Sequence, residues 1–229
     1  MITTSRQHFL HSLRSILHVS LFAPAALLLF CVLPLSAQKP HHFRHWFEGD
    51  PIDSYVYCNG KKVKALYSIR RGGRTVALGG ESYMVTAIDT TLSGRIVIPS
   101  HITGPDGREF AVTSISRHAL ADCSHITEVV LPECLHDIGD QSFMNCRSLR
   151  SIVLPPFTEY IWPYAFRGCT SLQRIEITGE MPPDAYSDVF DERTMRYATL
   201  VLPSLLAKDY HNAFIWNMFR YVVTNWDNN

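Results

Sequence analysis

Residues 119–132 read ALADCSHITEVVLP, residues 142–155 read SFMNCRSLRSIVLP, and residues 165–178 read AFRGCTSLQRIEIT. The three segments begin 23 residues apart, within a repetitive region that runs from Val112 to Pro183. Five apolar columns and a cysteine column keep one register: Ile115, Ile138 and Ile161; Leu120, Phe143 and Phe166; Cys123, Cys146 and Cys169; Ile126, Leu149 and Leu172; Val129, Ile152 and Ile175; Leu131, Leu154 and Ile177. A fixed period of this length predicts stacked units that bury their apolar faces against one another.

Each unit is expected to contain a strand, a turn and a short helical return. Ile126, Val129 and Leu131 follow an L-x-x-L-x-L pattern, in which the last two side chains point inward from one strand. Pro163 suits the first position of a helical turn and Gly168 suits its exit. The predicted fold class is an α/β solenoid with 23-residue units, a short parallel β-sheet on one face, and helical turns and loops on the other.

About five rungs are expected, because related strand segments lie on both sides of the quoted repeats. The first precedes a turn-rich insertion around Gly104–Gly107, and most of the segments end in proline, which offers no amide hydrogen to a neighbouring rung. The segments are 95–99, 128–132, 151–155, 174–178 and 199–203.

The segments flanking the rungs complete the predicted domain organisation. Short β-prone runs between glycine pairs predict an antiparallel N-terminal module, including a strand at Tyr83–Ile88. After Pro203, the helical spacing of Leu206, Tyr210 and Phe214 predicts a helix, followed by a short strand, as a C-terminal cap. The predicted boundaries are 1–37 for a signal peptide, 38–91 for the N-terminal module, 92–203 for the solenoid and 204–229 for the cap.

The first 37 residues have the pattern of a secretory signal peptide. Arg6 and Arg14 precede an uncharged run from Val19 to Leu35, and Ala37 is a small residue at the expected cleavage point. A membrane anchor is the alternative, although proline interrupts the run. We expect an exported protein, secreted or at the cell surface, or in the periplasm, with no membrane span after cleavage.

The charge of the chain excludes two classes of partner, and its cysteine content limits the possible disulfides. Beyond residue 37 the chain has 19 Lys and Arg against 21 Asp and Glu, with no basic tract for nucleic acid or anionic lipid. Five cysteines remain, an odd number, and the three column cysteines are expected to be buried free thiols. Cys58 and Cys134 are the remaining disulfide candidates.

The repeats resemble the BspA-like leucine-rich repeat family of exported bacterial proteins. The resemblance rests on Ser142-Phe143 with Cys146 and Leu149, on the equivalent Ala165-Phe166 with Cys169 and Leu172, and on the I-x-L-P segment of the Ser142 unit. Ala119-Leu120 and Thr178 depart from the pattern. The resemblance implies a secreted or surface location and adhesion or protein binding for some members, and it implies no active site, cofactor or agreed ligand.

The outward strand positions form the candidate binding surface for a protein or glycan ligand. Residues between the inward ones face out, and five rungs about 4.8 Å apart give a strip roughly 20 Å long. The alternative is that β-branched residues on an exposed sheet simply pack against one another. One column is Val97, Val130, Val153, Glu176 and Val201, and its neighbour is Arg95, Glu128, Ser151, Arg174 and Thr199. Tyr160, Trp162 and Tyr164 form a second aromatic patch that would suit a sugar or a protein, or would cover the core.

An enzyme is the opposing class, and it has weak support. Cys134, His136 and Asp137 stand together in a turn and suggest a thiol–imidazole pair. A nucleophile and its base normally come from separate parts of a fold, and no oxyanion-forming glycine motif accompanies them. No catalytic residues are therefore assigned. His41, His42 and His45 lack acidic or cysteine ligands at metal-site spacing, so no metal site is assigned either.

Overall fold

The computed structural model describes residues 47–80, 86–203, 210 and 212–224 of the 229-residue chain. The predicted signal peptide, the three histidines at 41, 42 and 45, and most of the helix predicted from Leu206 lie outside the described residues. The strands are β1 (Pro51–Cys58), β2 (Lys61–Ile69), β3 (Thr75–Leu78), β4 (Gly94–Val97), β5 (His101–Thr103), β6 (Glu109–Ile115), β7 (Ile126–Val130), β8 (Asp137–Ile138), β9 (Ser151–Leu154), β10 (Tyr160–Ile161), β11 (Arg174–Ile177), β12 (Asp184–Ala185), β13 (Thr199–Leu202) and β14 (Tyr221–Thr224). An α-helix, α2, spans Glu192–Tyr197, and a 3₁₀ helix, η2, spans Trp216–Met218.

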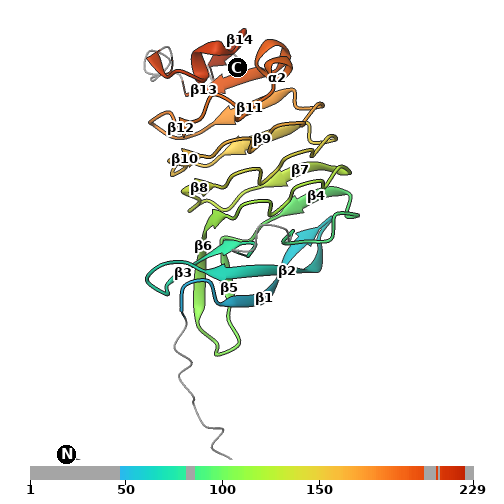
Figure 1. The fold of residues 1–229 in the computed structure, drawn as a ribbon, viewed down its shortest axis with the longest axis vertical. Coiled ribbons are helices and arrows are strands. Elements are labelled where there is room, and N and C mark those ends of the chain that lie inside the picture. Colours follow the sequence, from blue (N-terminus) through green and yellow to red (C-terminus); the bar gives the residue numbers. More distant parts are fainter. Residues whose placement is uncertain (1–46, 81–85, 204–209, 211, 225–229) are drawn as a thin grey trace, which may run out of the picture. The chain divides into compact units, whose positions relative to one another are not determined.

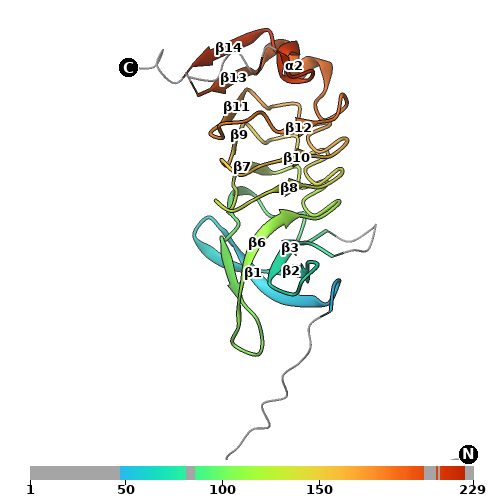
Figure 2. The same cartoon turned by 90° about the vertical axis from the view of Figure 1, so that its left-hand side faces the viewer.

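The described residues form a β-solenoid of about five turns, and its strands make two parallel ladders (Figures 1 and 2). We call β4, β7, β9, β11, β13 and β14 the strand ladder, and β6, β8, β10 and β12 the return ladder. In each turn the chain passes from a strand of the first ladder to a short strand of the second and then through a return to the next rung. The predicted stack of rungs is confirmed, whereas the second ladder was not predicted.

Alternating side chains explain the strand ladder. Ile152 and Leu154 of β9 are buried, while Val153 between them is exposed. The equivalent inward residues of β7 and β11 are buried in the same core cluster. Burial on one face and exposure on the other fixes the register, because a slip of one residue would turn every apolar side chain outward.

The N-terminal strands close one end of the solenoid. β1 and β2 form an antiparallel hairpin, β1 pairs with β4 of the strand ladder, and β3 pairs with β6 of the return ladder. One 14-stranded sheet therefore runs through the hairpin from one ladder to the other. The predicted strand at Tyr83–Ile88 is not confirmed: residues 86–88 are not in a strand, and 83–85 lie outside the described residues.

The predicted helical returns are not confirmed. Residues 117–122, 140–145 and 163–168 form hydrogen-bonded turns. Their backbone amides donate to the next rung: Leu120 to Ser142 (2.8 Å) and Phe143 to Ala165 (2.9 Å). These bonds between rungs replace the i to i−4 bonds of a helix, so the return depends on its neighbour.

Left-handed backbone conformations recur in the returns. Asp122, Asn145 and Gly168 have φ of 61°, 62° and 79°, respectively. A Cβ at Gly168 would collide with the Asn145 side chain. The backbone amide of Gly168 donates to the Asp191 carboxylate (2.7 Å). Glycine fits this position because it has no Cβ and tolerates positive φ.

An aromatic stack runs through the core on the return side. The rings of Phe143 and Phe166 are 5.1 Å apart at 5°, and those of Phe166 and Phe190 are 5.4 Å apart at 11°. Trp216 and Phe219 of the C-terminal segment meet Phe190 edge-on. These contacts agree with a C-terminal segment that covers the last rung. Phe214 does not take part in this covering, although its helical spacing from Tyr210 predicted that it would, because its side chain is exposed.

The column cysteines are buried free thiols, which confirms the prediction. The Cys146 thiol donates to the Leu120 carbonyl and the Cys169 thiol donates to the Phe143 carbonyl, both at 3.1 Å. Burial raises the pKa of Cys123 and of Cys169 to about 12 and raises the pKa of Cys146 well above its usual range. The column therefore consists of protonated thiols that link successive units.

Candidate functional site

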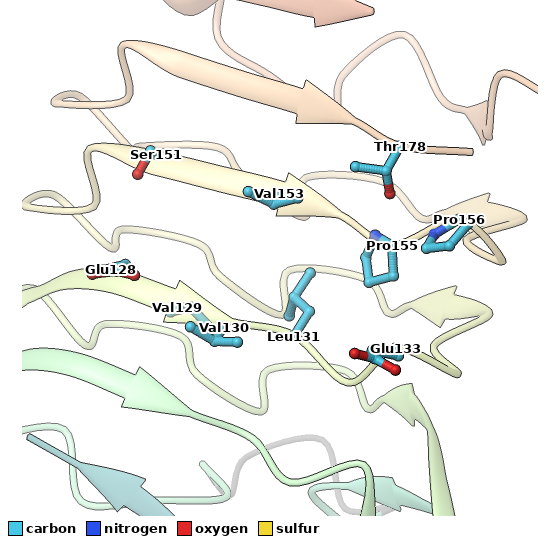
Figure 3. A pocket seen from close by; sticks show the side chains of 10 residues that line it. All are labelled: Glu128, Val129, Val130, Leu131, Glu133, Ser151, Val153, Pro155, Pro156 and Thr178. Carbon is cyan, nitrogen blue, oxygen red and sulfur yellow. The ribbon is translucent and has the colours of Figure 1, made fainter. Parts of the chain in front are cut away.

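A groove lies on the exposed face of the strand ladder, where the sequence predicts the binding surface (Figure 3). Its volume is about 340 Å³, and β7, β9 and the segments that follow β7, β9 and β11 provide its lining. We call it the valine groove, because Val130 and Val153 lie in its middle. The lining residues are Glu128, Val129, Val130, Leu131, Glu133, Ser151, Val153, Pro155, Pro156 and Thr178.

The structure brings only part of the predicted surface together. Val130 and Val153, with Glu128 and Ser151 beside them, line the valine groove, whereas Val97 lies one rung below on β4. Val153 has the most exposed side chain of the valine column, at 47% of its full surface. Arg95, Arg174, Glu176 and Thr199 lie on neighbouring strands outside the lining.

The prediction that Val201 faces solvent is wrong. Its side chain is 0% exposed, although it occupies the outward position of β13. The outward column therefore ends at Glu176, one rung earlier than predicted.

Most charges near the groove are already paired. The Arg95 Nε atom lies 2.9 Å from a Glu128 carboxylate oxygen, and Arg174 lies 3.2 Å from Glu176. Glu133 is exposed and makes no ion pair within the described part of the chain. The groove thus offers apolar contact along its middle and one uncompensated negative charge at an end.

The structure separates the chemical groups of the candidate thiol site. The Cys134 thiol donates to the carbonyls of Ser100 (3.6 Å) and Val112 (3.4 Å), and burial raises its pKa. Asp137 accepts a hydrogen bond from Ser114 (3.1 Å), while the His136 ring stacks on Phe157 at 6.3 Å. No hydrogen bond joins Cys134 to His136, so the imidazole does not activate the thiol in this arrangement.

No disulfide joins the two remaining cysteines: Cys58 and Cys134 are both free thiols. Among the described residues, no group of three His, Cys, Asp or Glu side chains is arranged to hold a metal ion. In the same residues, no helix has the length and apolar character needed to cross a membrane.

A second groove lies beside the predicted aromatic patch. Its volume is about 690 Å³, and the loops β9–β10 and β11–β12 line it. Tyr160 lines it, and Trp162, two residues further along the chain, is stacked on Tyr186 at 5.8 Å and 22°. Tyr164 is half-buried in the following turn. Phe157, Met181 and Tyr186 were not identified from the sequence. Tyr186 follows Trp162 by one residue more than the 23-residue period, so a repeat with a one-residue insertion predicts its position.

Residues 101–218 match the family described as BspA type leucine-rich repeat region, in 6 copies. No curated protein matches the chain. Several solved structures are similar to it. A leucine-rich repeat protein from Bacteroides capillosus is 23% identical with a TM-score of 0.36, and the match covers 50% of this chain and 94% of that one.

A leucine-rich cell surface protein from Faecalibacterium prausnitzii is 14% identical with a TM-score of 0.47, covering 75% of this chain and 43% of that one. The leucine-rich repeat protein of T. pallidum is 16% identical with a TM-score of 0.29, covering 65% of this chain and 92% of that one. The family match spans more than half of the chain and coincides with the rungs of the solenoid. The chain belongs to the BspA-type leucine-rich repeat family.

Proposed function

We propose that this chain is an exported, non-catalytic binding module that recognises a protein ligand in the valine groove at the bacterial cell surface. One observation carries the proposal: an apolar groove lies open on the parallel sheet, with Val130 and Val153 in its middle. Ligand sites are characteristically concave and largely apolar with a few polar groups, as this groove is.

The lining favours a protein segment over a glycan. Valine and proline side chains offer aliphatic contact, and the groove contains no aromatic ring on which a sugar could stack. Neighbouring rungs are about 4.8 Å apart, so an extended peptide can lie across several of them. The uncompensated Glu133 would favour a basic group at one end of that peptide.

Export and the domain division belong to the same proposal. The segment 1–37 supports it through its signal-peptide pattern, and the relative from Faecalibacterium prausnitzii is described as a cell surface protein. The N-terminal module (38–91), the solenoid (92–203) and the C-terminal cap (204–229) are proposed as one exported unit. The pairing of β1 with the strand ladder and of β3 with the return ladder supports joining the first two.

The test is capture of envelope and host-surface proteins by residues 38–229, the expected exported form. We expect Val130→Asp with Val153→Asp to weaken capture at least about tenfold, because two buried carboxylates would face an apolar partner surface. Val222→Asp is the matched control, since Val222 is similarly exposed (41%) on β14, away from the groove. Unchanged capture by the double aspartate variant, with circular dichroism of the wild type, would refute the valine groove.

The capture assay, together with a hydrolysis assay, separates the alternative classes. Cys134→Ala with His136→Ala should leave capture unchanged and should remove no hydrolytic activity. Loss of an activity on thioester or peptide substrates would replace the binding module by a thiol-dependent hydrolase. Failure to capture any partner from either source would favour a purely structural envelope protein.

A further inference from the structure

We infer that the second groove, between the loops β9–β10 and β11–β12, binds an arginine-rich extended segment of a partner protein. This site is distinct from the valine groove, and the two linings have Pro156 in common. Its lining residues are Pro156, Phe157, Thr158, Glu159, Tyr160, Glu180, Met181, Pro182 and Asp184.

Three exposed carboxylates give the groove its charge. Glu159, Glu180 and Asp184 line it, and none of them forms an ion pair within the described residues. The lining contains no Lys, Arg or His. An anionic ligand would therefore be repelled, and a cationic ligand would be attracted.

Two of these carboxylates lie on adjacent turns of the solenoid. The Asp184 amide donates to the Glu159 carbonyl at 2.8 Å, and Asp184 is the ladder partner of Tyr160. Glu159 immediately precedes β10 and Asp184 begins β12, so both carboxylates contribute to the negative potential of the same groove. A bound cation would be attracted by both.

The exposed aromatic and apolar side chains of the groove determine which kind of cation fits. Phe157 is 61% exposed, Met181 is 71% exposed, and Tyr160 is also exposed in the same lining. A guanidinium group is planar, stacks on aromatic faces and donates two parallel hydrogen bonds to a carboxylate. Arginine therefore uses both features of the groove, whereas an ammonium group uses the charge and only a weaker ring contact.

A metal ion fits this groove less well than a peptide. No three His, Cys, Asp or Glu side chains among the described residues are close enough to share an ion. The carboxylates are instead distributed along two loops, which suits charges spaced along an extended chain. A neutral glycan would use the aromatic rings and would gain less from the uncompensated charge.

The experiment measures fluorescence anisotropy of a labelled synthetic peptide of alternating arginine, glycine and serine, with residues 38–229. We expect binding at low ionic strength that weakens severalfold at about 0.5 M salt, because exposed charges are then screened. A peptide with glutamate in place of arginine should not bind. The variant Glu159→Gln with Glu180→Gln and Asp184→Asn should weaken binding about tenfold, the combined effect of three exposed ion pairs of ordinary strength.

Matched variants test each part of the site. Glu109→Gln removes an exposed carboxylate from β6, outside the groove, and should leave the affinity unchanged. Tyr160→Ala should weaken binding severalfold through loss of the cation–π contact, whereas Tyr221→Ala, which removes a similarly exposed ring from β14 outside the groove, should not. The pair Val130→Asp with Val153→Asp should not weaken binding, so failure of the valine groove does not imply failure here.

Two results would overturn the inference. One is an affinity of the triple carboxylate variant within twofold of the wild type, with an unchanged thermal unfolding midpoint. The other is binding of an N-acetylglucosamine oligomer that depends on Tyr160 but not on the carboxylates, which would make the groove a glycan site.

Discussion

The strand side and the return side of this solenoid are built from the same repeats, yet they are held together differently. On the strand side, β7, β9 and β11 pair in a regular parallel ladder, and inward and outward residues alternate. On the return side, turns with left-handed residues are joined by amide, thiol and side-chain bonds to the next unit. The strand side therefore depends on a local pattern, and the return side depends on having a neighbour.

The largest expected effect is loss of packing on the return side. Phe143→Ala should lower the free energy of unfolding by about 3–5 kcal/mol, because Phe143 is fully buried and stacks on Phe166. Leu154→Ala on the strand side should lower the free energy of unfolding by about 2–5 kcal/mol, since leucine loses fewer buried atoms than phenylalanine does. Urea denaturation measures both losses. A cost below about 1 kcal/mol for Phe143→Ala would mean that the aromatic stack does not hold the returns.

The buried column cysteines should react more slowly than the partly exposed Cys134. Iodoacetamide at about pH 8 should modify the partly exposed Cys134 at least about 100-fold faster than Cys146, because Cys146 is protonated and reacts only on local unfolding. Mass spectrometry of native protein gives the rates, and urea-unfolded protein is the control in which all thiols react. Equal native rates, or a disulfide within the column, would contradict the arrangement.

A smaller effect is expected at the left-handed turn positions. Asn145→Ala should cost about 1–2 kcal/mol, because alanine disfavours φ of 62° and the 2.8 Å bond from Asn145 Nδ2 to Asp122 is lost. Asn145→Gly keeps the backbone conformation and should cost less than Asn145→Ala. If the glycine variant is the less stable of the two in urea, the left-handed conformation is not what selects asparagine here.

The smallest effect is expected on the outward strand face. Val153→Ala should cost under about 1 kcal/mol, because nearly half of the side chain is already in water. Its neighbour Leu154 is the matched comparison, one position away on the same strand. Equal losses at the two positions in denaturant titrations would mean that inward and outward faces are not distinct.

The candidate sites were predictable to unequal degrees. The position of Val130 and Val153 on one exposed face follows from period-two alternation and the repeat. The boundaries of the valine groove do not, because Glu133, Pro156 and Thr178 reach it from loops of different rungs. Of the second groove's lining, only Tyr160 was identified from the sequence, since Glu159 and Asp184 come together through the pairing of β10 with β12.

The sequence by itself determined the repeat, the apolar columns, the strand positions and the buried thiols. These features are encoded within one unit, where the spacing of side chains decides which face of a strand is apolar. The tertiary structure decided the conformation of the returns, the second ladder, the closure by the hairpin and the burial of Val201. Each of these depends on hydrogen bonds or packing between residues of different units, which a local pattern of side chains does not specify.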